Sequence, residues 1–530
     1  MALPKNGTDF PLPQMAAIAP KYREYNAWYM ADASELSHIY STAGNKGKVG
    51  IFTRIKRMFM GTPPDEEGNQ HVYNLNVAAE ITRKSADLLF SDPVRIEARD
   101  TVEDRPQALD LSKLSARLQL LTGPYLDATL IGAAETAAAL GGTFLKVAWD
   151  ANIKDHAFIV KVDADLAVPE FAFGFLKSVQ FWHNVATEGS TVWRHVEEHF
   201  VDSDGIGLVR HALYMGRDDN VGIVVSLTDR DETRSFAEFV DENGCVSTET
   251  PGLSAVYLPN RTPNAIWRKD PLGANLGRSD FEGILQPLDA VNEAFSSLMR
   301  DIRLSKSTLI ISEKLLEDLG VGEGLAHDID REIFTQVKDT SVPDGDGNGM
   351  PITQVQFAVR VEDFQKVINF LKGALLSIAG YSSQTFGLVE SNSAMTATET
   401  NARERASHMT REAKVRLMAP QLSAIALKLL LTDAAKFDTG ITVPDGVVIE
   451  SIFADAVQPD AEAISAQNAS DFSSQSASTV TRVGRAHPDW SPAQVKKEAE
   501  LILAEHKKPE PAAAAPAETV VEPAEDQVAA

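Results

Sequence analysis

The stretch FEGILQPLDAVNEAFSSLMRDIRLS, residues 281–305, decides how the chain is organised. Large apolar residues recur in it at every third or fourth position: Leu285, Leu288, Val291, Phe295, Leu298 and Ile302. An α-helix has about 3.6 residues per turn, so this spacing places all of these side chains near one face. The sequence therefore predicts one long amphipathic helix with a single apolar stripe.

A second long helix is predicted in VEDFQKVINFLKGALLSIAGY, residues 361–381. Its expected stripe consists of Phe364, Val367, Leu371, Leu375 and Ile378. The residues between the two helices, 306–360, include the Gly-rich turn PDGDGNGMP and indicate a short mixed segment. Two long helices therefore bracket a small insertion.

The region before the first long helix is predicted to be α+β. Residues 1–20 contain four prolines and are expected to be a loose arm, and residues 21 to about 150 follow a mostly helical pattern. A change from small-residue helix to strand is expected at Gly141. Residues 144–267 combine β-type patterning with repeated turn signals, which is typical of several short strands.

The region after the second long helix starts with SSQTFGLVESNSAM, a polar loop at residues 382–395. A capping-box pattern at Thr396 and Glu399 then predicts the start of another helix. This helix should run to about residue 432 and kink near Pro420, whose ring removes a backbone donor.

The C-terminal part is predicted to contain one strand and a small helical unit. The strand is expected in GVVIESIF, residues 446–453, and the helical unit at residues 455–507. The last helix of that unit should start at Ser491, because Pro492 is well placed in a first helical turn. Residues 508–530 are rich in Pro, Ala and acidic residues and are expected to be disordered.

Composition excludes several classes of protein. The chain has 530 residues and a net charge of −25, which argues against a general nucleic-acid coat, because proteins that hold DNA by its phosphates are usually basic. One cysteine, Cys245 in a polar stretch, rules out an intrachain disulfide and favours a reducing compartment. Without a signal-peptide pattern or a run of about 18 apolar residues, the chain is expected to be soluble and made inside the cell, with no membrane partner.

One stretch carries the spacing of a metal site. TVWRHVEEHF, residues 191–200, contains the H-x-x-E-H pattern of inverted zinc hydrolases in His195, Glu198 and His199. That pattern binds zinc on a helix, whereas alternation and β-branched residues here predict a strand of a hairpin, on which the two histidines would lie roughly 13 Å apart. We therefore expect solvated His and Glu side chains on a strand, and a zinc-dependent hydrolase is the alternative function.

No other catalytic motif is found. The stretch STAGNKGKVG lacks the first glycine and the Ser/Thr of a phosphate-binding loop, and GDGNGM lacks the closing Glu of a calcium loop. There is no G-x-S-x-G pattern, and no motif surrounds the cysteine. We expect no catalytic residue, no metal and no cofactor.

The helix predicted at residues 396–432 is basic in an acidic chain. It carries six basic residues, Arg403, Arg405, Arg411, Lys414, Arg416 and Lys428, against three acidic ones, Glu399, Glu404 and Glu412. These cations could pair with acidic groups of their own or an adjacent subunit, or they could contact phosphates. Both interpretations stay open.

The order of these parts resembles the portal protein of long-tailed bacteriophages, the head-to-tail connector. The resemblance covers about residues 70–507, and no part of it is a catalytic motif. Its specificity lies in the order and spacing of five stretches: ADLLFSDPVRIE, GGTFLKVAWD, LPNRTPNAIWRKDPLGANLGRSDFEGILQPLDAVNEAFSSLMRDIRLSK, TATETNARERASHMTREAKVRL and HPDWSPAQVKKEAELILAE.

The resemblance implies an α+β portal fold with an α+β wing, a two-helix stem, a small α/β clip, a kinked spine helix and a helical crown. The implied parts of this chain are an N-terminal arm (1–20), the wing (21–280), the stem helices (281–305 and 361–381), the clip (306–360), a channel loop (382–395), the spine with a return strand of the wing (396–454), the crown (455–507) and a disordered acidic tail (508–530). The crown is short for the family, and the family pattern does not place the arm.

The resemblance also implies site residues. Contacts between subunits would be made by the two stem stripes: Leu285, Leu288, Val291, Phe295, Leu298, Ile302, Phe364, Val367, Leu371 and Leu375. The DNA channel would be lined by residues of the channel loop: Ser382, Ser383, Gln384, Thr385, Phe386, Ser391 and Asn392.

The implied function is structural rather than enzymatic. Family members form rings of twelve at one capsid vertex, so the implied partners are further copies of the chain, double-stranded DNA in the channel, the terminase large subunit, scaffold and major capsid protein, and a head-tail adaptor. The terminase supplies the ATPase. The implied location is the virion, after assembly in the cytoplasm of a bacterial host.

Overall fold

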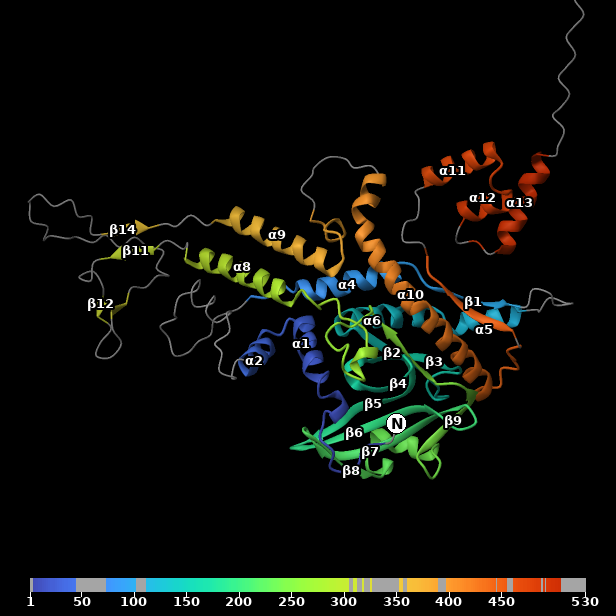
Figure 1. Cartoon of the computed structure of the whole chain (residues 1–530), viewed down its shortest axis with the longest axis horizontal. Coiled ribbons are helices and arrows are strands. Elements are labelled where there is room, and N and C mark those ends of the chain that lie inside the picture. The colour runs from blue at the N-terminus through green and yellow to red at the C-terminus, as the bar shows by residue number, and fades with distance from the viewer. Residues whose placement is uncertain are drawn as a thin grey trace, which may run out of the picture. The chain divides into compact units, whose positions relative to one another are not determined.

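The structure is a computed structural model, which describes residues 3–43, 73–101, 111–304, 308–311, 317–318, 325–326, 352–355, 360–388, 397–444, 446–454, 461–487, 490 and 492–506. The chain divides into two compact units, Met1–Ala456 and Val457–Ala530. Both α-helices and β-sheets build the first unit, as predicted (Figure 1).

The described helices are α1 (Ala19–Met30), α2 (Ala33–Ala43), α4 (Val77–Phe90), α5 (Ser112–Leu121), α6 (Pro124–Leu140), α7 (Asp231–Arg234), α8 (Leu285–Leu304), α9 (Val361–Ala379), α10 (Ala397–Lys436), α11 (Ala461–Ser474), α12 (Thr479–Ala486) and α13 (Pro492–His506). The described strands are β1 (Arg95–Asp100), β2 (Gly142–Ala148), β3 (Phe158–Asp163), β4 (Ala167–Ala172), β5 (Phe175–Glu188), β6 (Thr191–Val201), β7 (Ile206–Arg217), β8 (Asn220–Val225), β9 (Cys245–Pro251), β10 (Ala255–Pro259), β11 (Thr308–Ile311), β12 (Glu317–Asp318), β13 (Leu325–Ala326), β14 (Ile352–Val355) and β15 (Val447–Ile452). The predicted helix-to-strand change falls at Gly141, between α6 and β2, and is confirmed.

The sheets of the first unit are antiparallel. The largest has six strands in the order β4-β5-β6-β7-β8, with β9 also paired to β7. A three-stranded sheet has the order β10-β2-β3, and β1 pairs with β15. The last pair joins residues 95–100 to residues 447–452, so the strand predicted after the long helix returns to the α+β region.

Two apolar cores support the first unit. One lies among the N-terminal residues, α1, the six-stranded sheet and the ends of α8 and α9 that are nearest this sheet. The other lies among α4, α5, α6, α10, β2 and β15. Helix α6 contributes to both, because its alanines let neighbours approach on more than one side.

The N-terminal residues are not the loose arm that their prolines predict. Leu12, Met15 and Ile18 are buried in the first core. The backbone of Asp9 forms a β-bridge with Asn220, and the hydroxyl of Tyr214 donates a hydrogen bond to the Pro4 carbonyl at 3.0 Å. The arm therefore extends the sheet edge, a contact across more than 200 residues that local patterning cannot reveal.

The second unit is helical, as predicted. Its described residues form α11, α12 and α13, and α13 begins at Pro492. Val483, Val495 and Ala499 make up its small buried core, with Trp490 and Ile502 packed against them. The predicted disordered tail at residues 508–530 lies outside the described residues.

Candidate functional site

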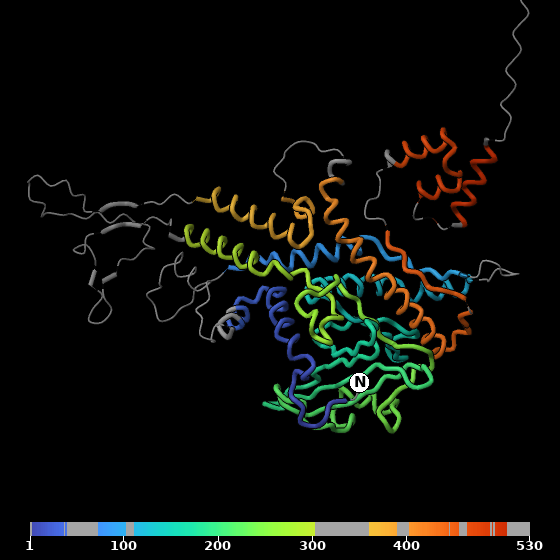
Figure 2. Tube along the Cα trace, in the orientation of Figure 1, coloured from blue at the N-terminus to red at the C-terminus, as the bar shows by residue number. Residues whose placement is uncertain are grey.

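Helices α8 and α9 pack side by side and form a helical hairpin (Figures 1 and 2). An ion pair of 3.4 Å joins Asp301, near the end of α8, to Arg360, just before α9. The two helices are therefore antiparallel. Beyond that ion pair along the chain, strands β11 and β14 pair with each other, as do β12 and β13, so the described parts of the insertion are β-structure.

The predicted stripes are buried only near the α+β region. Three stripe residues are buried in the first core: Leu288, Val291 and Leu375. Two more, Leu285 and Leu371, are partly buried against it. Farther along the hairpin the stripe residues are half-buried or exposed: Phe295, Leu298, Phe364, Val367 and Ile302.

Helix α9 has a second apolar face. Val367, Phe370 and Ile378 are 49%, 74% and 56% exposed. Together with the exposed Ala374 they follow helical spacing, so they form one row, which we call the outer row of α9. The prediction of a single stripe is therefore wrong, because Leu371 and Leu375 face their own core whereas Val367 and Ile378 lie in the outer row.

The predicted channel loop starts with a structured segment. The backbone N–H of Ser382 donates to Ser407 Oγ of α10 at 2.9 Å, and the hydroxyl oxygens of Thr385 and Ser407 lie 2.8 Å apart. Phe386 packs against the first core, with its ring centroid 5.9 Å from that of Tyr381. These contacts lie within one chain, and they do not support the prediction that Ser382, Thr385 and Phe386 line a DNA channel.

Of the other predicted channel-loop residues, two are described by the structure and two are not. Ser383 and Gln384 are half-buried at the start of a short 3-10 helix, Gln384–Phe386. Ser391 and Asn392 lie outside the described residues. Residues beyond Leu388 are therefore the part of this loop on which a channel role still rests.

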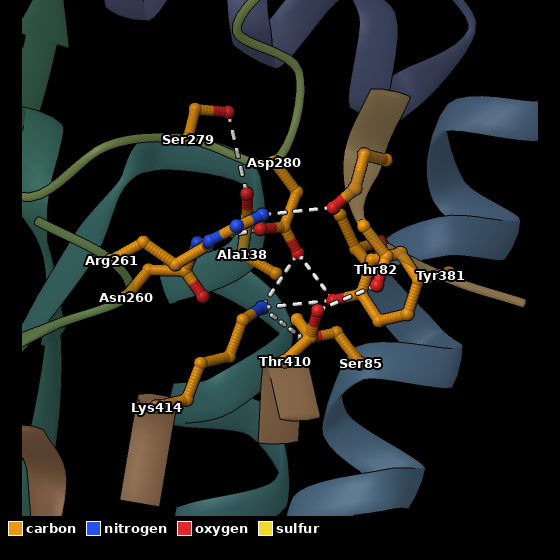
Figure 3. A network of polar contacts seen from close by, with 12 residues as sticks. Thr82, Ser85, Ala138, Asn260, Arg261, Ser279, Asp280, Tyr381, Thr410 and Lys414 are labelled. Atoms are coloured by element: carbon orange, nitrogen blue, oxygen red, sulfur yellow. Dashed lines mark hydrogen bonds and ion pairs between the residues drawn. The ribbon is translucent and has the colours of Figure 1, made fainter. Parts of the chain in front are cut away.

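A buried polar junction holds the start of this loop (Figure 3). Lys414 Nζ of α10 donates to Asp280 Oδ2 at 2.6 Å and to Ser85 Oγ of α4 at 2.6 Å. The Tyr381 hydroxyl, just after α9, donates to the same Asp280 oxygen at 2.8 Å. Asn260 Nδ2 donates to the other oxygen of Asp280 at 2.9 Å. The junction therefore joins α4, α10, the end of α9 and the segment before α8.

The end of α9 is held by further contacts of the same junction. Arg261 donates to the Ala379 carbonyl at 2.8 Å, and Thr410 Oγ1 of α10 donates to the Gly380 carbonyl at 2.5 Å. Gly380 has a φ of +88°, and a Cβ there would lie 2.9 Å from Thr410 Oγ1. A glycine is thus required for α9 to end this close to α10.

The charges of the junction are set by burial and by direct pairing. Burial alone would raise the pKa of the Asp280 carboxyl, but Lys414 and the neighbouring donors outweigh it and lower that pKa. Burial, together with the Asp280 charge, raises the pKa of Tyr381 well above its ordinary value, so its hydroxyl stays a donor. The result is an ionised, fully hydrogen-bonded pair in a site that water does not reach.

This junction was not predicted from the sequence. Lys414 lies four residues before Met418 and eight before Leu422, which are both buried, so helical periodicity alone places it on the buried face of α10. A lysine on such a face requires a buried partner. The partner itself, Asp280, is 134 residues away and carries no local signal.

The basic residues of α10 divide into two groups. Arg411 donates to the carbonyls of Leu88 and Ala454 at 2.7 and 2.6 Å, and Lys428 donates to Thr250 Oγ1 at 2.7 Å and to the Gly252 carbonyl at 2.8 Å. With Lys414, three of the six cations are therefore buried within their own subunit. The other three, Arg403, Arg405 and Arg416, are exposed, so only they could contact phosphates.

Helix α10 runs continuously through Pro420 as one 40-residue helix. Among the described residues, its segment Ala402–Lys436 is the one helix long and apolar enough to cross a membrane by length and composition alone. Its apolar residues Leu422, Ile425, Leu429 and Leu430 are instead buried in the second core. In this fold the segment is a core helix.

The H-x-x-E-H residues lie on strand β6, as predicted, but they are buried rather than solvated. His199 contacts Ser254 Oγ at 2.7 Å and Glu197 Oε1 at 2.8 Å, whereas His195 contacts His211 at 3.1 Å. Glu198 accepts from Arg210 at 3.1 Å. The three motif residues thus have separate partners, and no group of three potential ligands is found among the described residues. This geometry does not favour the hydrolase alternative.

The other stretches that resemble motifs lie mostly outside the described residues. The glycine-lysine stretch at residues 41–50 is described only as far as residue 43, and GDGNGM lies outside the described residues. Cys245 is buried at the start of β9 rather than exposed in a loop.

The histidines of the six-stranded sheet predict a loss of stability in acid. Burial lowers the pKa of His195 to about 3 and that of His211 to about 4 in the folded chain, with Glu197, Lys146 and His183 nearby. Below pH 6.5, the ordinary pKa of histidine, unfolded chains therefore bind protons that folded chains do not. The free energy of unfolding consequently decreases as the pH is lowered. Between about pH 6.5 and about pH 5, each histidine should contribute a loss of up to about 2 kcal/mol.

Denaturant unfolding at both pH values checks this prediction. A His195→Gln, His211→Gln variant should lose less stability between the two values than the parent does, although it is less stable at neutral pH. Equal losses in the two proteins would show that these histidines are not held neutral by burial.

Comparison with known proteins gives distant likenesses only. No family model and no curated protein matches the chain. A solved structure of the neck of an empty gene transfer agent (GTA) particle, computed with C6 symmetry, contains a chain similar to this one at a TM-score of 0.38 and 10% identity, with 81% of this chain and 91% of that chain covered. A second is in the virion of a native GTA particle, at a TM-score of 0.35 and 10% identity, with 83% and 94% covered. At these scores the likeness does not establish a shared fold.

Proposed function

We propose that the chain is the structural subunit of a phage portal ring, which conducts double-stranded DNA at one capsid vertex and catalyses no reaction. The proposal rests first on the order of sequence stretches that resembles portal proteins. It is supported by an α+β body, an antiparallel pair of long helices with β-structure between them, a 40-residue helix and a separate helical unit, found in the expected order.

The observation that carries the proposal is the outer row of α9. Val367, Phe370 and Ile378 expose large apolar side chains on a helix whose other apolar side is already buried in its own chain. Exposed rows of this kind mark protein contacts. In a closed ring each copy presents the same helical hairpin to the next copy. A neighbouring subunit would therefore cover the outer row of α9 in every copy.

The charge of the chain suits a channel for moving DNA. With a net charge of −25, the protein as a whole repels phosphates, and three of the six basic side chains of α10 are buried within the subunit. A wall that held phosphates strongly would slow DNA, because each contact must be broken as the duplex advances. The proposed partners are the DNA in transit and, as the portal resemblance implies, the terminase large subunit, scaffold and major capsid protein, and a head-tail adaptor.

The DNA-conducting role is tested by charge in the channel loop. Replacing Asn392 with lysine repeats one new positive charge in every subunit, so packaging with the cognate terminase should slow severalfold at low salt and recover as salt rises. Asn152→Lys, at an exposed turn after β2, is the matched control and should package at the parent rate. Unchanged, salt-independent packaging by intact Asn392→Lys rings would show that this loop does not face DNA.

A further inference from the structure

The hairpin between β4 and β5 presents two phenylalanines to solvent. Ala172 pairs with Phe175, so the turn consists of Phe173 and Gly174 alone. Phe173 is 101% exposed and Phe175 is 79% exposed. We call these two side chains the phenylalanine knob.

The backbone of the turn is unfavourable for a phenylalanine. Both turn residues have positive φ, 53° at Phe173 and 85° at Gly174, as in the tight turns that usually carry Asn or Asp at the first position. A bulky side chain at positive φ is strained. Full exposure means that no described residue of this chain covers the Phe173 ring, so the ring is available for contact with another molecule.

The same chain has an apolar cavity that suits such a knob. It measures about 440 Å³ and lies among the N-terminal arm, α1 and the beginning of β4. Its apolar lining includes Phe10, Leu12, Met15, Met30, Val168 and Trp182. Met30 is 64% exposed, which places it where the cavity opens to solvent.

The cavity wall is acidic, and an exposed lysine lies beside the knob. Asp32, Glu35 and Asp165 contribute three carboxyl groups to the cavity wall, against one cation, Arg23. Lys177, two residues after Phe175, has a side chain that is 60% exposed while it pairs with Glu170 at 2.8 Å. A knob approaching the cavity would thus bring an exposed lysine towards a net negative rim.

A subunit cannot fill its own cavity with its own knob. Val168, in the cavity wall, and Phe173 lie on the same hairpin, five residues apart, which is roughly 16 Å of extended strand. Ladder hydrogen bonds between β4 and β5 hold that separation. Since knob and cavity are different patches of one molecule, their contact joins one copy to the next in a head-to-tail manner, and such contacts form a ring when the rotation between copies closes.

We propose that the phenylalanine knob of one subunit inserts into the cavity between the N-terminal arm and α1 of a neighbouring copy of this chain. The contact adds a second interface, on the sheet of the α+β body, to the one proposed for the helical hairpin. The insertion itself can be detected between two copies of the chain. Only the closure of such contacts into a ring rests on the proposed function.

Cross-linking in full-length protein tests the insertion. In a Cys245→Ser background, one preparation carries Phe173→Cys and the other Met30→Cys, and the two are mixed and treated with a short thiol-specific cross-linker. We expect a covalent pair that contains one chain of each kind. Phe239→Cys replaces Phe173→Cys in the matched control, because Phe239 is also exposed, at 68%, but lies outside the hairpin; this mixture should give no pair above background.

A second variant measures the effect on assembly. Phe173→Ser with Phe175→Ser should raise the protein concentration needed for half-assembly at least about tenfold, since two large apolar side chains lose their burial. Phe239→Ser should leave it unchanged. Both side chains are exposed in one copy, so the double variant should keep the stability of the parent monomer, and denaturant unfolding of the monomer excludes a folding defect as the cause.

The outcomes separate this inference from the proposed function. Rings that form normally with both serines, together with no specific cross-link, would overturn the insertion and leave the ring intact. A specific cross-link in a protein that never closes into rings would support the insertion and contradict the portal function. Absence of both cross-link and rings would overturn both.

Discussion

Replacing Lys414 with methionine should lower the free energy of unfolding by about 3–5 kcal/mol, because it leaves Asp280 as a buried carboxylate without its cation. Asp280 is 2% exposed and Lys414 is 1% exposed, so water cannot take the place of the missing ammonium. Arg416→Met, two residues later on the exposed side of α10, is the control and should change the free energy by no more than about 0.5 kcal/mol.

A double variant identifies the cause of that loss. Lys414→Met combined with Asp280→Asn removes both charges, so most of the lost stability should return. Unfolding by denaturant, followed in the four proteins of this cycle, measures the coupling. If Lys414→Met proved as stable as Arg416→Met, or if the second substitution only added to the damage, the ion pair would not hold the junction.

Placing aspartates at Val367 and Phe370 should abolish ring assembly and leave the monomer folded. Both side chains are already exposed in one copy, so the monomer should change in stability by no more than about 0.5 kcal/mol. In an assembled ring the new carboxylates would be buried without partners, at a cost of several kcal/mol in each subunit.

Gln365→Asp with Asn369→Asp is the matched control. It adds two carboxylates to the same helix at exposed polar positions, so its rings should form as the parent's do. Sizing by light scattering distinguishes the two variants. Rings of parental size from Val367→Asp, Phe370→Asp would show that the outer row of α9 is not an interface.

Elements with a strong local pattern could be predicted from the sequence. The long helices α8, α9 and α10, the strand over residues 191–201 and the start of α13 at Pro492 all follow from periodicity, alternation or capping. Their positions depend on residues within a turn or two of each other, and such preferences are encoded locally. The prediction of a strand also implied that His195 and His199 lie too far apart to share a zinc ion.

Contacts between distant segments could not be predicted in the same way. The bridge from Asp9 to Asn220 and the pair of Asp280 and Lys414 join residues far apart in sequence. Proline content makes the arm resemble a loose segment, although its apolar residues are the ones that pack. Periodicity also cannot say which of two neighbouring apolar rows on α9 faces the subunit's own core, since both satisfy the same spacing.

The native mass of the purified full-length chain tests the central claim most directly. We expect a closed ring near twelve copies of a 57.5 kDa chain, with twelve taken from the portal resemblance, and a central opening visible by electron microscopy. A monodisperse monomer at micromolar concentration, with no ring under any packaging condition, would contradict it.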